Sequence, residues 1–167
     1  MMKYLYWLIP ISWMSVIFYS SATPYENQDI KPLLGTMVDL SFLESISRPI
    51  SFTYNQSVIS VNTLGVNGFV EFFIRKATHI TVFFLLALFF YLAFRKTTNM
   101  KQYHCLVYAF LLTVLYAMAD EKHQGMTPNR TPYIGDVGLD SLGALLAVLV
   151  IVITWQKNKR TDKNVNI

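Results

Sequence analysis

Four long segments of the chain carry almost no charge, and this pattern constrains the fold more than any other feature. They are Tyr4–Tyr19, Ala77–Phe94, Tyr103–Ala119 and Leu139–Trp155. Each is about 16 to 18 residues long, near the lower end of the length that a helix needs to cross a bilayer core. The run ITVFFLLALFFYLAF in the second segment lacks the polar stripe of a soluble bundle helix. Because a helix satisfies its own backbone hydrogen bonds in lipid, the pattern predicts an all-α membrane protein with four transmembrane helices.

The composition agrees with a membrane protein of one domain, covering residues 1–167. Hydrophobic residues make up 53% of the chain and charged residues only 14%, against about 25% in ordinary soluble domains. The single cysteine, Cys105, lies in an apolar segment, so we expect a buried hydrophobe and no disulfide. The net charge of +4 comes without a basic patch interleaved with aromatic residues, so nucleic acid is not an expected partner. The basic tail from Lys157 to Lys163 suits anionic lipid headgroups instead.

The first apolar segment has a second interpretation. Lys3, the apolar run and the small residues Ser20–Ala22 also fit a signal peptide that is cleaved off. Cleavage would leave three spans, with the two ends of the chain on opposite sides of the membrane. We expect the segment to be retained as the first span, and cleavage stays the alternative.

The distribution of basic residues predicts the orientation of the four spans. One side would hold eight Lys and Arg near the spans, and the other side four. The eight are Lys3, Arg95, Lys96, Lys101, Lys157, Lys159, Arg160 and Lys163, and the four are Arg75, Lys76, Lys122 and Arg130. Because the side with more basic residues usually faces the cytoplasm, we expect both termini to be cytoplasmic.

The first loop, residues 20–73, would then lie outside the cell and is too patterned to be a disordered linker. In PISFTYNQSVISV, two β-favouring runs flank residues 54–57, which predicts a short β-hairpin. The following LGVNGFVEFFIRK is apolar with helical spacing and should lead directly into the second span.

Three clusters of polar residues should meet at the outer end of the bundle, because consecutive helices with short loops run up and down. The first opens the second span, the next closes the third, and the last opens the fourth. Their members are Arg75, Lys76 and His79; Asp120, Glu121, His123 and Gln124; and Asp136 and Asp140. Spacings of four residues place Arg75 with His79, Asp120 with Gln124, and Asp136 with Asp140 on shared helix faces.

Asp140 is the most informative of these residues, since it lies about one turn inside an apolar helix. A carboxylate there is costly, so it should face the protein interior and have a basic partner. We expect that partner among Arg75, Lys76 and His79. Gly143 and the two alanines below it would let a neighbouring helix come close.

Each polar residue also has a purely structural explanation. Asp136 would serve as an N-cap of the fourth helix, and Lys122 would be a solvated charge. Arg130, after the turn signal MTPN, would be an ordinary loop residue. His79 and His123 would be hydrogen-bonded interface histidines, and the whole cluster an ion-pair network without a ligand.

Four stretches in order along the chain resemble one known family. FYSSATPYENQD, EFFIRKATH, DEKHQGMTPNR and DVGLDSLGALL look like the VanZ-like family, with similar spacing over nearly the whole chain. The resemblance implies a small multi-helix membrane protein of the bacterial cell membrane, linked to the cell envelope. Its name-giving member is associated with low-level teicoplanin resistance, so a contribution to glycopeptide resistance is a further implication. Lys122 and residues 126–129 depart from the more apolar, glycine-containing version of this loop.

The polar positions of the family carry over onto ten residues of this sequence. They are Arg75, Lys76, His79, Asp120, Glu121, His123, Gln124, Arg130, Asp136 and Asp140. On this basis we expect a site that binds an anionic envelope molecule: a lipid headgroup, a wall precursor or a lipoglycopeptide antibiotic. Arg75, Lys76 and Arg130 would bind its phosphate or carboxylate, and the two aspartates of the fourth helix would orient these bases.

Two other functions stay open. In an enzyme at the membrane surface, Glu121 or Asp120 would act as general base, with His79 or His123 as acid. We expect no cofactor, and no metal, because EKH lacks the H-E-x-x-H spacing and there is no cysteine set. A lipid transport or flipping role would need polar groups through the bilayer middle, whereas these gather at one end. The sequence does not set the oligomeric state.

Overall fold

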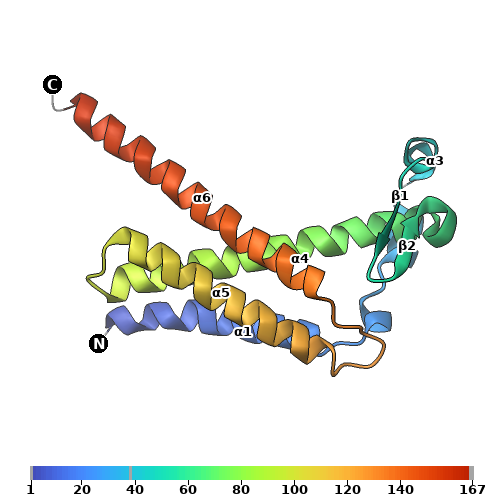
Figure 1. Ribbon diagram of the computed structural model, residues 1–167, viewed down its shortest axis with the longest axis horizontal. Helices are drawn as coiled ribbons and strands as arrows, with labels where there is room; N and C mark the ends of the chain where they lie inside the picture. The colour runs from blue at the N-terminus through green and yellow to red at the C-terminus, as the bar shows by residue number, and fades with distance from the viewer. Residues whose placement is uncertain (1, 38, 166–167) are drawn as a thin grey trace.

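The computed structural model describes residues 2–37 and 39–165 and is mostly helical (Figure 1). Among the described residues, three helices are long and apolar enough to cross a membrane: Val61–Thr97, Gln102–Gln124 and Ile134–Lys159. A fourth span results if Lys3–Ser21 and Tyr25–Met37, bent by 115° against each other, count as one. The protein is therefore multi-pass, with three to four candidate spans. The elements are η1 (Met2–Trp7), α1 (Leu8–Ser21), η2 (Tyr25–Gln28), α2 (Lys31–Met37), α3 (Ser41–Ser47), β1 (Ser51–Tyr54), β2 (Ser57–Ser60), α4 (Val61–Thr97), α5 (Gln102–Gln124) and α6 (Ile134–Val165).

The long helices form a bundle whose two ends differ. The short α4–α5 turn and both chain termini lie toward one end, whereas residues 22–60 and the α5–α6 connection lie at the other (Figure 1). We call this second end the loop end. α6 crosses α4 and α5, and its C-terminal half leaves the bundle.

Small residues bring α4 and α6 into close contact, as expected from the sequence. A Cβ atom added to Gly143 would lie 2.2 Å from the backbone oxygen of Ile80, closer than any real side chain could be. Ala87, Ala144 and Ala147 are buried together beside this crossing. Close backbone approach at small residues is a recurrent way of packing helices in membranes.

The outer faces of the bundle are apolar as well as its interior. Phe83, Leu86 and Phe90 form a buried core with residues of α1 and α5. Leu115 on α5 is 60% exposed and Ile153 on α6 is 51% exposed. Helices that are apolar on exposed and buried faces alike are typical of membrane spans.

The predicted hairpin is present and leads directly into α4. β1 and β2 pair antiparallel, with Tyr54 opposite Ser57. Asn55 and Gln56 both have positive φ, of 44° and 63°, as a two-residue turn matched to strand twist requires. α4 begins at Val61, so the helix is longer than its lipid-crossing part, and Gly65 introduces a bend near its start.

The first apolar segment differs from the single helix predicted over residues 4–19. It starts as a 3-10 helix and becomes α-helical only at Leu8, so α1 has 14 residues. Pro10 gives a physical reason, because proline lacks the amide hydrogen and is tolerated only in the first turn of an α-helix. The short segments η2, α2 and α3 in the first loop were also not predicted.

Candidate functional site

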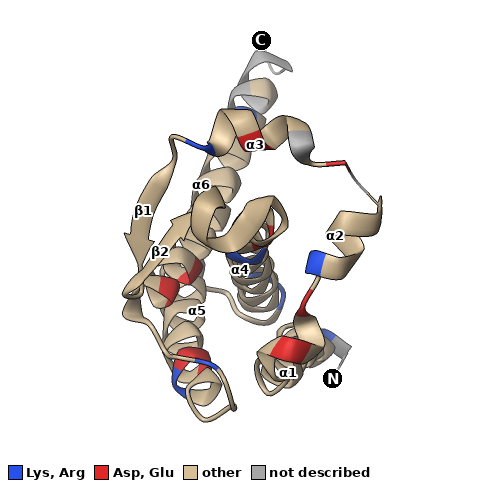
Figure 2. Ribbon diagram, turned by 90° about the vertical axis from the view of Figure 1, so that its right-hand side faces the viewer, with Lys and Arg blue, Asp and Glu red and all other residues tan. Residues whose placement is uncertain are grey.

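A cavity of about 750 Å³ at the loop end brings most of the predicted site residues together. This volume lies within the range of known ligand pockets. Its walls come from α1, η2, the hairpin, α4, α5 and the α5–α6 connection. Figure 2, which faces the loop end, shows acidic and basic positions on several elements at this end, whereas the strands of the hairpin carry none.

Arg75 on α4 is held by Glu71, a residue that the sequence analysis missed. Its Nε and Nη2 donate to Glu71 Oε1 at 3.1 and 2.9 Å. Glu71 is only 2% exposed, and its other oxygen accepts from the Tyr25 hydroxyl at 3.0 Å. The Tyr25 ring also stacks on the guanidinium, 4.3 Å from Cζ. The i, i+4 spacing of Glu71 and Arg75 in EFFIR was the signal that could have found this pair.

Arg130, in the α5–α6 connection, has only neutral acceptors. It donates to Gln124 Oε1 at 3.0 Å, to Gln28 Oε1 at 2.5 Å and to the Ser20 carbonyl at 3.5 Å. Its Nε is buried and has no hydrogen-bond partner among the described residues. Arg130 is therefore more than an ordinary loop residue.

Burial and neighbouring charges both affect the pKa of Arg130. Burial lowers this pKa most, and the nearby Arg75 guanidinium lowers it further. The carboxylates of Asp120 and Glu121 act in the opposite direction without forming an ion pair with Arg130, and they do not outweigh the first two effects. Arg130 is thus a partly buried guanidinium that forms no ion pair among the described residues, although two carboxylates lie near enough to act on it.

Gln28 on η2 joins the two guanidinium groups. Its backbone oxygen accepts from Arg75 Nη2 at 2.6 Å, while its side-chain oxygen accepts from Arg130. Its amide nitrogen donates to the Ser20 carbonyl at 2.9 Å. The predicted pair Arg75 and Arg130 therefore meets at one edge of the cavity, through a residue that no sequence motif identified.

Lys76 forms a second pair, with Asp136 on α6. Lys76 Nζ lies 2.5 Å from Asp136 Oδ1, which also accepts from the Tyr54 hydroxyl at 2.6 Å. Burial, followed by the hydrogen bond to Asp136, raises the pKa of Tyr54, so this phenol stays a donor. Asp136 therefore links α6 to α4 and the hairpin, a role that goes beyond the N-cap alternative.

His79 is the partner of Asp140. The His79 Nδ1 and Asp140 Oδ1 atoms are 3.1 Å apart, and the Asp140 side chain is fully buried. The expectation of a basic partner on the second span is thus met by His79. Arg75, another of the three expected partners, does not pair with Asp140, because it lies one turn nearer the loop end and binds Glu71.

The acidic end of α5 faces inward, as predicted. Asp120, Glu121 and Gln124 are 4%, 6% and 9% exposed, whereas Lys122 is exposed. Gln124 Nε2 donates to Asp120 Oδ2 at 2.8 Å, and Glu121 Oε1 accepts from the backbone amide of Tyr133 at 2.5 Å. One buried oxygen each of Asp120 and Glu121 has no partner within the described part of the chain.

His123 does not join the residues that line the cavity. Its ring stacks on that of Phe18, with the centroids 4.0 Å apart and the planes 11° from parallel. This contact fastens α5 to α1. In the described ranges 2–37 and 39–165, no group of three His, Cys, Asp or Glu residues could hold a metal ion.

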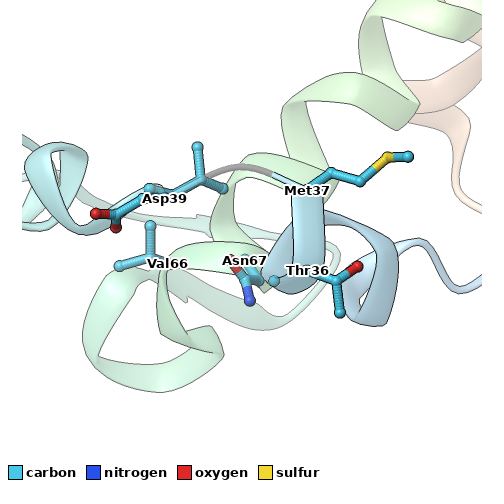
Figure 3. Close-up of a pocket in the computed structure, with 7 residues that line it drawn as sticks. Thr36, Met37, Asp39, Val66 and Asn67 are labelled. Carbon is cyan, nitrogen blue, oxygen red and sulfur yellow. The ribbon is translucent and has the colours of Figure 1, made fainter.

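A second hollow, of about 480 Å³, lies between α2 and α4 (Figure 3). Thr36, Met37, Asp39, Val66 and Asn67 line it. It contains none of the ten predicted site residues, and no basic side chain lines it among the described residues. The larger cavity is therefore the better candidate site.

Comparison with known proteins agrees with the assignment drawn from the four motifs. The family model VanZ/LLP1 matches residues 6–155, a range that includes all ten predicted site residues. Neither the curated proteins nor the solved structures gave a match. With a match over most of its length, the chain belongs to the VanZ/LLP1 family.

Proposed function

We propose that this membrane protein binds an anionic envelope molecule, with the anionic group in the cavity at the loop end. The observation that carries the proposal is Arg130, a partly buried guanidinium that lines the cavity, lies near Arg75 and has only neutral hydrogen-bond partners. Removing a charge from water is costly unless an opposite charge compensates it. A phosphate or carboxylate would supply that charge.

The chemistry of the two arginines favours an oxyanion as the ligand. A guanidinium offers a planar fork of donors that matches the oxygens of phosphate and carboxylate. Glu71 and Asp136 hold Arg75 and Lys76 in place, so their donors need little reorganisation when an anion arrives. A lipid headgroup, a wall precursor and a lipoglycopeptide antibiotic share this chemistry, and the last would link the site to glycopeptide resistance.

The proposal includes a topology. We place the loop end outside the bacterial cell membrane and both termini in the cytoplasm. The excess of basic residues near the opposite end of the spans supports this orientation.

Lipid retention tests the proposal. The parent protein and Arg130→Gln are purified in mild detergent, and retained anionic lipid per protein is measured by mass spectrometry. Lys122→Gln is the matched control, because it removes the same charge from an exposed position near the same end. We expect Arg130→Gln to lose anionic lipid about tenfold, as for one charge-assisted hydrogen bond, and Lys122→Gln to behave as the parent. Equal retention in all three proteins would refute the proposal.

One observation favours an enzyme as the second candidate. His79 lines the cavity, and Asp140 engages its Nδ1, an arrangement that orients a histidine for proton transfer. Of the two histidines that the sequence suggested, His79 is thus better placed than His123. Conversion of labelled envelope lipids by the parent protein, abolished in His79→Ala, would support catalysis over binding.

A further inference from the structure

The wall of the cavity changes character with distance from the loop end. The charged and polar groups that concern the ligand lie toward the loop end, at the level of Ser20 on α1 and Arg75 on α4. Deeper in the bundle, the same two helices contribute Trp13, Ile17 and Val82. The Trp13 indole donates to the Val82 carbonyl at 3.0 Å, so the two helices are joined at this deep end. One cavity therefore offers both a place for charge and a place for hydrocarbon.

One side of the cavity is open between α1 and α4. Val16 on α1 and Ile74 on α4 both line the cavity, and they are 56% and 39% exposed. Thr78, one turn after Ile74, lines the cavity and is exposed as well. Because these side chains border the cavity and keep much of their surface exposed, we infer that the gap between α1 and α4 is a lateral opening on the side of the bundle that would face lipid.

We propose that the ligand is a membrane amphiphile with a phosphate-type anionic head, which enters sideways between α1 and α4. Its head lies at Arg75 and Arg130, and its chain lies against Trp13, Val16 and Ile74. This inference rests on the proposed function and adds the chemical class and the route. A small water-soluble anion would use only the polar part and leave the apolar part unfilled, whereas the lateral opening lets a chain continue into the bilayer.

Trp13 is a built-in reporter for the chain. The chain has three tryptophans, so Trp7→Phe with Trp155→Phe leaves Trp13 as the single tryptophan, which is excited selectively at the red edge of the absorption band. This protein is placed in nanodiscs with phosphatidylglycerol brominated in its acyl chains, or with phosphatidylcholine brominated in the same way. We expect the anionic lipid to quench Trp13 at a several-fold lower mole fraction, and Arg130→Gln to remove the difference.

A substitution at the lateral opening between α1 and α4 tests the proposed route of entry. Thr78→Phe places a ring in the lateral opening, and Thr81→Phe is its matched control. Thr81 is exposed on the same helix and bonds to the preceding turn in the same way, but it does not line the cavity. We expect Thr78→Phe to weaken quenching by brominated phosphatidylglycerol and Thr81→Phe to leave it unchanged.

A soluble probe separates failure of this inference from failure of the proposed function. Inorganic phosphate should raise the unfolding temperature of the parent and of Thr78→Phe, but not of Arg130→Gln. If phosphate does so while both brominated lipids quench Trp13 equally, the site takes soluble anions and the inference is overturned. Equal effects of Thr78→Phe and Thr81→Phe on quenching would overturn the lateral route. If neither phosphate nor lipid responds to Arg130→Gln, the proposed function fails as well.

Discussion

Alanine substitutions at two glycines of α6 should change the stability of the protein in opposite directions. At Gly143, an added Cβ would lie 2.2 Å from the Ile80 oxygen and 3.1 Å from the Phe84 nitrogen, both backbone atoms of α4. At Gly138, also on α6, an added Cβ would meet nothing within 4 Å. Gly143→Ala must therefore push two helix backbones apart, whereas Gly138→Ala only changes helix propensity.

The expected magnitudes follow from these distances. Alanine is favoured over glycine in a helix by about 0.5–1 kcal/mol, so Gly138→Ala should stabilise the protein by about that amount. Overpacking typically costs about 1–3 kcal/mol, and contact with rigid backbone places Gly143→Ala at the upper end of that range or beyond. For a chain of this size, a stability change of 1 kcal/mol usually shifts the unfolding temperature by about 2–4 °C. The unfolding temperatures of the two variants should therefore differ by several degrees.

Cys105 provides the assay for this comparison. It is the only cysteine in the chain and is fully buried, so a fluorogenic maleimide reacts with it only when the bundle opens. The temperature of maleimide labelling is measured for the parent, Gly138→Ala and Gly143→Ala in the same detergent. If Gly143→Ala unfolds no earlier than Gly138→Ala, the close crossing of α4 and α6 is refuted, and with it the geometry that brings Asp140 to His79.

Three other predictions concern the site and the topology. Asp140→Ala should destabilise the protein by about 3–5 kcal/mol if the buried pair is ionic, and adding His79→Ala should restore part of this loss; strictly additive effects would show that the two side chains do not interact. In a background without the native cysteine, Thr53→Cys should react with an impermeant thiol reagent in intact cells and Asn158→Cys should not, and the reverse pattern would invert the topology. Because the pKa of Tyr54 is raised, the unfolded chain loses this proton first as the pH rises past about 10. Unfolding by alkali should therefore be less steep in Tyr54→Phe than in the parent, and an unchanged profile would show that this phenol does not contribute.

Hydropathy predicted where helices cross lipid but not where they begin and end. The segment before residue 77 has no uninterrupted apolar run, so its helical spacing, not its hydropathy, predicted that it leads into the second span, and α4 begins as early as Val61. The hairpin was predictable because strand-favouring residues flank two residues that tolerate positive φ. The short helices α2 and α3 have seven residues each, too few for a periodic pattern to stand out.

The site was predictable as a gathering of charges but not as a set of pairs. Helical spacing places charged residues on one face, and this is enough to bring α4, α5 and α6 together at one end. Which residues pair depends on how far one helix is shifted along its axis relative to its neighbour, and a shift of one turn changes the partner. The spacing of residues on one helix does not reveal this shift. Arg75 therefore pairs with Glu71 on its own helix, while His79, one turn deeper, reaches Asp140. The role of Gln28 could not be predicted, because it ends a four-residue 3-10 helix in the first loop, and the path of this loop depends on tertiary contacts.

The pairs within the site differ in a way that bears on function. Three of the pairs join residues of the long helices. One lies within α4 and involves Glu71, and two connect α4 to α6 through Asp136 and Asp140. Arg130 and Gln28, by contrast, come from the two loop segments that close the cavity. A network that served only packing would place an arginine without an ion-pair partner where solvent could reach it. Arg130, which forms no ion pair among the described residues, instead lies partly buried between two loops and near a second guanidinium. Loops can adjust around a ligand at small cost while the helix pairs keep the remaining donors in place, so this distribution favours a binding site over a structural ion-pair network.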